Sequence, residues 1–459
     1  MAPLYLRTTM SQIVDVTTII EAIQPELSGG KFASVVDRIN PASPAQTADI
    51  LERLPAAQQP VLFRLLPKDR ASAVFDILSP KQQSGLIQGL RNREVSEIFA
   101  GLDPDDRALL LDELPASLAT RLLTGLTGAQ RRLTTDLLGY PKGSIGRRMS
   151  PQVVSTRATY TAADTLSRIQ KRLGDAETIY TIPVVDNARR VVGIISLRQL
   201  LAADSHAVIA DIMSKAEVAS AYDSAEDAAR ICIELRLLAL PIVDRECRLL
   251  GILTVDDAGR IIEHEDSVDS ARQGGMEPLG RPYLSTPVLQ LVRSRIVWLL
   301  VLAVGATLTV QVLSVFEATL EQVTVLALFV PLLIGTGGNT GNQAATTVTR
   351  AIALGDVHTS DLLRVLLREC AAGFTLGTLL GLIGALMTGA IFGAPIGLTI
   401  GLTLLAVCTV AASIGGIMPL IAKRLNVDPA VFSNPFITTF VDATGLIVYF
   451  LIAKAVLGI

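Results

Sequence analysis

The acid with the clearest chemical meaning in this sequence is Asp442, because it lies inside the last apolar segment, FITTFVDATGLIVYFL. An acid within a membrane span costs at least about 2.5–3.5 kcal/mol, so we interpret it as functional. Thr438 and Thr439 lie one turn earlier, and Thr444 lies nearby. A single carboxylate among hydroxyls and amides suits a hard cation that keeps much of its water. The alternatives are an acid that pairs two helices and a proton site.

A second polar stretch, GTGGNTGNQ at 335–343, interrupts another apolar segment. A phosphate-binding loop would need Lys-Ser or Lys-Thr after the glycines, and a dinucleotide site would need a soluble strand–helix–strand unit. Irregular backbone at membrane depth persists only where it is buried in protein or lines a wet cavity. We therefore expect a break whose freed carbonyls, with the amides of Asn339, Asn342 and Gln343, face water or an ion. The alternative is that the glycines only allow helices to cross closely.

One acid within a span per chain is little negative charge for binding a divalent ion. A two-fold axis would place two Asp442 carboxylates together. We therefore infer a homodimer with a shared pore.

Composition excludes several function classes. The net charge of −3 and the lack of a basic run argue against a nucleic-acid partner. The four cysteines are scattered and contain no CxxC pair, so we interpret them as small apolar side chains. The three histidines show no metal-ligand or triad spacing, so an enzyme is not expected. No signal peptide precedes the first 290 or so residues, which we expect to stay in the cytoplasm.

The region 290–459 predicts an all-α domain of five membrane spans, at 296–316, 323–354, 366–392, 397–421 and 435–457. With a cytoplasmic N-terminus, the basic residues of the connections all fall inside, and the outer connections EATLEQ and GAPI contain none. We therefore expect a multi-pass protein of a cell membrane of the bacterial inner-membrane type, surrounded by lipid, with its C-terminus outside. The basic residues are Arg281, Arg293, Arg295, Arg350, Arg364, Arg368, Lys423 and Arg424.

An internal repeat occupies the middle of the chain. IPVVDNARRVVGIISLRQL at 182–200 returns as LPIVDRECRLLGILTVDDA at 240–258, and IGRRMS at 145–150 returns as IADIMS at 209–214. Each copy predicts two apolar strands joined by a turn that Asp186 or Asp244 opens, with amphipathic helices around them. The repeat resembles a tandem pair of CBS modules, at 141–205 and 206–262, which implies an α+β fold.

The first part of the chain lacks a catalytic pattern. Residues 1–30 are weakly patterned, and we expect them to be partly disordered. From 31 to 140, apolar stripes ending near a proline recur, as in LERLPAAQ, FRLLPKDR and LDELPASL. Proline ends one helix and is tolerated in the first turn of the next. The pattern predicts short helices stacked into a superhelix.

An acidic helix at about 256–274, within a connecting segment of 256–280, follows the repeat. Its acids fit a solvated helix face. They also fit a cation-sensitive element, because clustered carboxylates repel one another and a divalent cation relieves the repulsion. The acids are Asp256, Asp257, Glu263, Glu265, Asp266 and Asp269.

The order of these parts, with the motifs PLLIGTGGNTGNQ and VDPAVFSNPFITTFVDATGLIVYF, resembles the MgtE family of magnesium channels over nearly the whole chain. The chain as a whole is thus expected to be a multidomain membrane protein. The resemblance implies that Asp442 holds hydrated Mg2+ at the dimer axis. Asn342 and Asn434 match polar positions along the same path, and Glu321 matches an acid near the outer mouth.

The resemblance also implies that the acidic helix is a plug that closes the pore when cytosolic Mg2+ bridges it to the soluble domains. The candidate regulatory ligands are Asp257, Asp269, Glu263 and Glu265 of the acidic helix, together with Asp227. Asp105 or Asp106 of the superhelix is expected to face them. The sensor departs from the family, since Arg236 and Leu237 stand where an acid is expected. We expect magnesium gating that is weaker or involves fewer ions.

Nucleotide binding stays open. The first module reads SLRQL where the family commonly has Asp after Arg, so Gln199 places ATP binding in doubt. Two other functions also remain. One is a secondary transporter that exchanges a divalent cation for sodium or protons at Asp442. The other is a membrane sensor based on the CBS pair, whose spans only anchor it.

Overall fold

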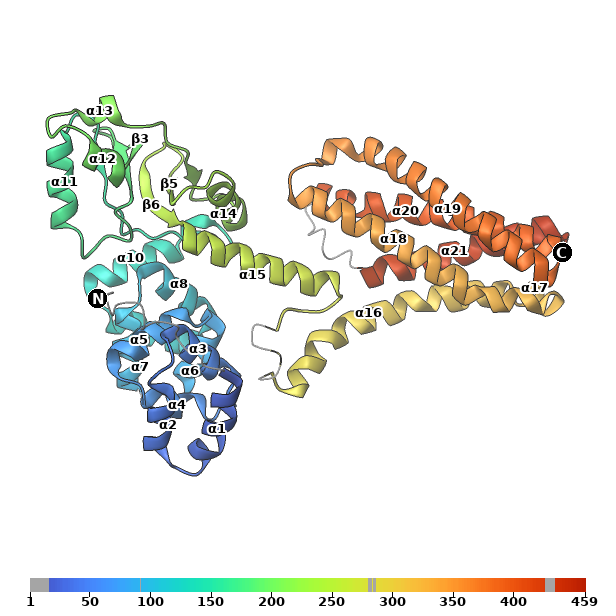
Figure 1. The fold of residues 1–459 in the computed structure, drawn as a ribbon, viewed down its shortest axis with the longest axis horizontal. Helices are drawn as coiled ribbons and strands as arrows, with labels where there is room; N and C mark the ends of the chain where they lie inside the picture. Colours follow the sequence, from blue (N-terminus) through green and yellow to red (C-terminus); the bar gives the residue numbers. More distant parts are fainter. Residues whose placement is uncertain (1–15, 91, 280–282, 284–285, 426–433) are drawn as a thin grey trace, which may run out of the picture. The chain divides into compact units, whose positions relative to one another are not determined.

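A computed structural model describes residues 16–90, 92–279, 283, 286–425 and 434–459. The chain divides into two compact units (Figure 1). The soluble unit holds the described residues up to Glu265, and the membrane unit holds Asp266–Leu279 and Pro287–Ile459.

The first part of the soluble unit is a stack of short helices, as the proline repeat predicts. Several begin with proline at the first helical position, and Ser43 and Thr127 close capping boxes with Gln46 and Gln130. Their apolar stripes form one core around Phe75 and Phe99. The helices are α1 (Val16–Ser28), α2 (Phe32–Ile39), α3 (Pro44–Arg53), α4 (Gln59–Arg64), α5 (Lys68–Ile77), α6 (Pro80–Gly89), α7 (Asn92–Gly101), α8 (Pro104–Glu113), α9 (Ala116–Gly125) and α10 (Gly128–Leu138).

Val16–Ser28, within the segment 1–30 that we expect to be partly disordered, form the helix α1. Ile23 and Leu27 of this helix are buried in the same core as α2 and α3. The helix was hard to predict because its stripe is short and Pro25 lies inside it. Residues 1–15 lie outside the described part of the chain.

The middle of the soluble unit contains two three-stranded sheets with equivalent register. Thr181 pairs with Ser196 in the first sheet, and Ala239 pairs with Thr254 in the second, 58 residues later in both strands. The elements are η1 (Ile145–Arg147), β1 (Thr156–Arg157), α11 (Ala162–Lys171), β2 (Thr181–Val185), β3 (Val191–Ser196), α12 (Leu197–Ala202), α13 (Ile209–Ile212), β4 (Ala219–Ser220), α14 (Ala225–Glu234), β5 (Ala239–Val243) and β6 (Leu249–Thr254).

The repeated Met-Ser dipeptide braces the two sheets crosswise. Ser150 exchanges backbone hydrogen bonds with Ile252 of the second sheet, and Ser214 exchanges them with Ile194 of the first. A Cβ at Gly251 would lie 2.6 Å from the carbonyl oxygen of Ser150. A glycine is therefore required there, because only its backbone allows this approach.

The acidic helix is confirmed as α15 (Val255–Gln273). It begins directly after β6, and it ends in two glycines. Gly275 has φ +66°, the left-handed conformation that often ends a helix.

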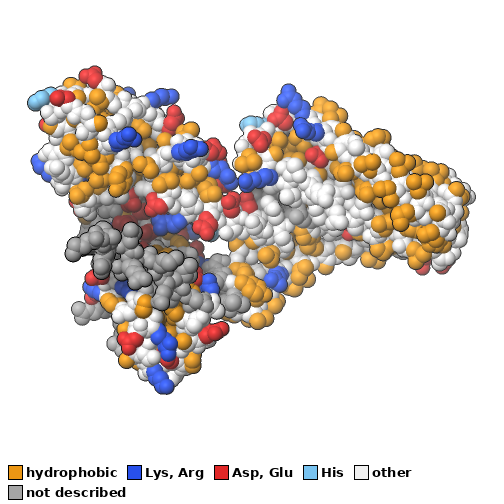
Figure 2. All heavy atoms as spheres, in the orientation of Figure 1, with side chains coloured by type: hydrophobic (Ala, Val, Ile, Leu, Met, Phe, Trp, Pro, Cys, Tyr) orange, Lys and Arg blue, Asp and Glu red, His pale blue; other side chains and the backbone are white. Residues whose placement is uncertain are grey.

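The membrane unit contains five helices long and apolar enough to cross a membrane, counted over the described residues, as predicted. Hydrophobic side chains cover much of its visible surface, and Lys and Arg gather at one end (Figure 2). The elements are α16 (Val288–Val315), α17 (Glu317–Gln322), η3 (Thr324–Phe329), α18 (Val330–Ala353), η4 (Thr359–Asp361), α19 (Leu362–Phe392), α20 (Ala394–Arg424) and α21 (Asn434–Leu457).

The helices α19 and α20 are antiparallel neighbours in close backbone contact. A Cβ at Gly377 would lie 2.7 Å from the carbonyl oxygen of Leu405, and one at Gly381 would lie 2.6 Å from that of Gly401. Small residues allow this approach, which drives helix association where lipid is as apolar as the side chains.

Candidate functional site

The polar residues of the two sequence motifs meet where α18 packs against α21. Asn342 Nδ2 donates a hydrogen bond to Thr438 Oγ1 at 2.9 Å. A Cβ at Gly338 would lie 3.0 Å from Cγ2 of the same threonine. The structure therefore brings together two stretches that lie 96 residues apart in sequence.

Asp442 lies one turn beyond Thr438, at the i+4 position of α21, so both side chains share a face of that helix. Its carboxylate is half-buried, and Oδ1 is buried without a hydrogen-bond partner among the described residues. The same is true of Oδ1 of Asn342. Two orphaned oxygens on neighbouring helices are acceptors of the kind that a hydrated hard cation uses.

The expected break in the span at 335–343 is wrong. The α-helix α18 runs without interruption through GTGGNTGNQ, and only the preceding turn, η3, is 3₁₀. Gly337, Gly338 and Gly341 face neighbouring helices instead, whereas a Cβ at Gly335 would meet nothing within 4 Å. A Cβ at Gly337 would lie 2.7 Å from a Val407 methyl, and one at Gly415 would lie 2.1 Å from the carbonyl oxygen of Gly341. The close-crossing alternative is therefore correct for the glycines, and the helix frees no carbonyls.

Close packing does not explain the side-chain amides of Asn339 and Gln343. Asn339, Gln343 and Thr346 are exposed on α18, at i, i+4 and i+7. They form a polar stripe on a helix that is otherwise suited to lipid. Such a stripe in a span faces protein or a wet cavity, because lipid cannot satisfy it.

Two further predicted pore residues lie outside this group. Glu321 is exposed in α17, in the connection between α16 and η3. Asn434 begins α21, and its side chain lies outside the described part of the structure.

A second ionic site lies in the soluble unit, where acids of α5, α8 and α15 gather. Asp105 and Asp106, in the first turn of α8, lie within electrostatic range of Asp257 at the start of α15. Asp257 accepts a hydrogen bond from Thr254 Oγ1 at 2.6 Å and forms an ion pair with Arg260.

Burial and mutual repulsion dominate the electrostatics of this acidic cluster. Burial, with the nearby charges of Asp106, Asp257 and Glu177, raises the pKa of Asp105 well above its usual range. Burial raises the pKa of Asp106 to about 7, although Arg260 opposes the shift. Asp105 Oδ1 is also buried without a partner among the described residues. Carboxylates in this arrangement favour a proton or a cation.

Sequence reasoning missed three members of the cluster. Asp76, at the end of α5, Asp103, before α8, and Glu177, after α11, each have a pKa raised by burial first and by nearby acids second. Asp103 belongs to the run DPDD and could have been found from it. The other two have no local pattern.

The other candidate regulatory acids are more scattered. Asp227 is exposed in the first turn of α14, and no interaction among the described residues joins it to the cluster. Glu265 has Arg148 as a charged neighbour, which makes it less available to a cation. Glu263 is exposed on α15, and Asp269 is half-buried in the membrane unit.

The described residues hold no group of three His, Cys, Asp or Glu side chains spaced to bind a metal ion directly. The sites fit an ion that keeps its water. The acidic cluster also fits an ion that bridges carboxylates from several helices. Gln199 caps α12 with Ser196 and donates to Ser214 Oγ at 3.2 Å, so its amide is engaged within the CBS pair.

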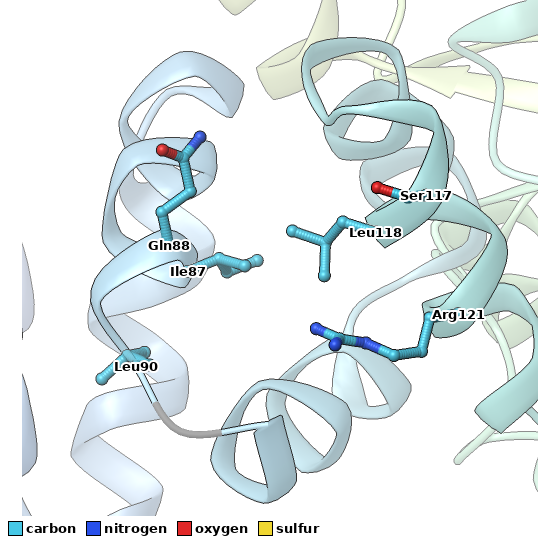
Figure 3. Close-up of a pocket in the computed structure, with 6 residues that line it drawn as sticks. All are labelled: Ile87, Gln88, Leu90, Ser117, Leu118 and Arg121. Carbon is cyan, nitrogen blue, oxygen red and sulfur yellow. The ribbon is translucent and has the colours of Figure 1, made fainter.

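A surface hollow of about 330 Å3 lies between α6 and α9 (Figure 3). Ile87, Leu90 and Leu118 form its apolar lining, and Arg121 lies at its edge. No predicted site residue lines it. The hollow therefore adds nothing to either ionic site.

Comparisons with known proteins agree with this architecture. A family model described as a divalent cation transporter matches 330–452, the MgtE intracellular N domain matches 42–143, and the CBS domain matches 143–206 and 209–263.

Relatives are similar over most of the chain. The magnesium transporter MgtE of Thermus thermophilus is 34% identical over 441 residues, which are 95% of this chain and 98% of the relative. That of Enterococcus faecalis is 32% identical over 70% of each chain. A solved cytosolic domain of the Mg2+ channel MgtE in complex with ATP is 31% identical, with a TM-score of 0.48, and covers 53% of this chain and 99% of its own.

Proposed function

Because this membrane protein belongs to the MgtE family of magnesium transporters, we propose that it is a homodimeric channel for Mg2+ that closes when cytosolic Mg2+ binds its soluble unit. The observation that carries the proposal is the group formed by Asp442, Asn342 and Thr438. It places one carboxylate beside neutral polar groups at the crossing of two spans.

The chemistry of this group favours passage of a hydrated ion. One negative charge attracts a divalent cation without removing its water, and the amide and hydroxyl can bond to that water. An ion that binds too tightly does not leave, so a weak site suits conduction. Mg2+ in particular gives up its water reluctantly.

Two observations support a dimer. Asp442 is the only acid on this face of α21, and a two-fold axis would pair two such carboxylates. The polar stripe of Asn339, Gln343 and Thr346 is exposed in the single chain. A second copy would close a water-filled path over this stripe and remove it from lipid.

The distribution of basic residues supports the orientation with the soluble unit in the cytoplasm. Arg293 and Arg295 lie near the start of α16, Arg364 and Arg368 near the start of α19, and Lys423 and Arg424 at the end of α20. The opposite ends, at α17 and Gly393, contain no Lys or Arg. The positive-inside rule then places the C-terminus outside.

The acidic cluster supports closure by Mg2+. Asp105, Asp106 and Asp257 repel one another across α8 and α15, and a divalent cation would turn this repulsion into attraction. Because α15 leads from the soluble unit into the membrane unit, its position can report whether the cluster is occupied.

Uptake into liposomes with no counter-ion gradient tests the function. We expect wild type to admit Mg2+ and Asp442→Ala to fall to the rate of empty liposomes. Thr444→Val is a matched control, because the Thr444 hydroxyl bonds the carbonyls of its own helix. Uptake that requires sodium or protons would favour a coupled transporter, and equal uptake by both chains would place the pore elsewhere.

A further inference from the structure

The segment that follows α15 is docked on α16 by three hydrogen bonds within the membrane unit. The backbone N–H of Glu277 donates to the carbonyl oxygen of Ser294 at 2.9 Å. Trp298 Nε1 donates to Glu277 Oε1 at 3.1 Å. Gln290 Nε2 donates to the carbonyl oxygen of Leu279 at 3.3 Å. The residues on α16 are spaced by four, so one face of that helix receives the segment.

Full burial on α16 is confined to this contact. Ser294 is the only buried residue of Val288–Val315, all of which the structure describes. Farther along α16, Leu300 and Val304 are exposed apolar side chains suited to lipid, whereas Val312 and Leu313 are partly buried against a core of the membrane unit. The start of α16 is therefore held by 274–279 rather than by the packing of its own apolar surface.

The bond between Trp298 and Glu277 has a defined chemistry. Tryptophan favours the membrane–water interface, where its N–H usually meets lipid headgroups or water. Here the N–H meets a carboxylate of the connecting segment instead. A hydrogen bond to a charged acceptor is about twice as strong as one between neutral groups. Mechanical tension on the segment would therefore reach α16.

The same face of α16 continues toward the pore residues. Gly305 lies seven residues after Trp298, two turns along the same stripe. A Cβ at Gly305 would lie 3.0 Å from Cγ2 of Thr439, which is three residues before Asp442 on α21. A shift of α16 along its axis would thus change its contact with the helix that carries Asp442.

We propose that Glu277, Ser294 and Trp298 form a clamp that couples α15 to α16, so that binding at the soluble unit changes the pore through this contact. The inference rests on the proposed gating by Mg2+. Gly274 and Gly275 supply the turn between α15 and the clamp, and the chain beyond the turn is fixed to α16. Glu277 and Trp298 are positioning residues, since neither belongs to the ion site.

Excised membrane patches that contain the full chain test the clamp. We expect Glu277→Ala and Trp298→Phe to raise the Mg2+ concentration that halves the current from the soluble-unit side by about tenfold or more, as for one lost hydrogen bond to a charged group. Current without Mg2+ on that side stays at the wild-type level. Glu277→Gln keeps an acceptor oxygen and should close nearly as wild type does, and Val297→Ala, on an exposed neighbouring position, is the control.

The single tryptophan supplies a readout that does not need conduction. Mg2+ added to the purified full chain should shift the emission of Trp298 in wild type, and the shift should be lost in Glu277→Ala. Closure of both clamp variants at the wild-type Mg2+ concentration, or an emission that Mg2+ leaves unchanged in wild type, overturns the clamp. If the wild-type chain carries no Mg2+ current but its emission still shifts when Mg2+ is added, the result counts against the proposed channel and leaves the clamp standing.

Discussion

The two ionic sites of this protein are built in opposite ways. In the soluble unit, several acids from α5, α8 and α15 lie together with too few cations to neutralise them. In the membrane unit, one acid lies beside an amide and a hydroxyl. The first arrangement is unfavourable until a cation or proton arrives, whereas the second supplies a single charge that would attract an ion weakly. Under the proposed function, the first is the site for sensing and the second the site for passage.

The packing around the two sites also differs. The acidic cluster lies over apolar cores made by large side chains such as Phe75 and Phe99. The membrane site is set by glycines that bring backbones together, at Gly338 and Gly341 on α18 and Gly415 on α20. The position of the pore groups therefore depends on helix crossings that tolerate no added methyl.

The largest expected effect comes from removing the carboxylate charge of Asp442. Asp442→Asn keeps the shape of the side chain but should reduce Mg2+ flux at least tenfold, since about 2–4 kcal/mol of attraction is lost. Asp442→Glu should retain measurable flux because it keeps the charge. Flux into liposomes measures both. Equal flux in the Asn and Glu variants would show that polarity, not charge, is what the site supplies.

The next effect is steric and concerns the crossing of α18 and α20. Gly415→Ala places a methyl 2.1 Å from the carbonyl oxygen of Gly341 and should destabilise the membrane unit by about 3 kcal/mol. Gly335→Ala is the control, because a Cβ there meets nothing within 4 Å. Thermal unfolding in detergent measures the difference. If both variants melt alike, the close crossing is not what positions the site.

A third prediction concerns the pH dependence of the soluble unit. The pKa of Asp106 is raised to about 7, so the folded chain binds more protons than the unfolded one between about pH 4 and pH 7. The contribution of Asp106 to stability is therefore present below about pH 4 and is lost as the pH rises through 7. Asp106→Asn should raise the free energy of unfolding at pH 8 by on the order of 2 kcal/mol and flatten this dependence.

The same variant sharpens the comparison with the membrane site. Mg2+ should stabilise wild type more at pH 8 than at pH 6, since protons compete for the acids. Asp106→Asn should gain less from Mg2+ at pH 8. Calorimetry of the full chain with and without Mg2+ measures both effects. An undiminished gain in the variant would exclude Asp106 from the sensing site.

The smallest effect should come from a neutral partner in the pore. Thr438→Val removes the acceptor of the Asn342 amide. It should lower the free energy of unfolding by about 1 kcal/mol and reduce Mg2+ flux about threefold. Thr439→Val serves as a second control, because its hydroxyl bonds Pro435 of its own helix. A loss as large as that of Asp442→Asn would mean that the hydrogen bond, rather than the charge, organises the site.

Local patterns were enough to predict most elements. The 58-residue repeat predicted the strand pairs β2–β3 and β5–β6 and their turns, because each of these strands is apolar and each turn is opened by an aspartate. The third strand of each sheet, β1 or β4, was not predicted. Apolar length predicted five spans, since a helix must cover the bilayer with few charges. Asp442 stood out in its span because an acid is costly there.

Contacts between distant segments were beyond such patterns. A glycine both loosens a helix and allows a neighbour to approach, and the sequence of 335–343 does not say which. The answer lies in Gly415, more than seventy residues later, which closely approaches Gly341 on a helix that runs without a break. Likewise, Asp76 and Glu177 join the acidic cluster only because the folded chain packs their elements together. Residue types and periods thus specify elements and costly groups, whereas partners far along the chain depend on how those elements pack.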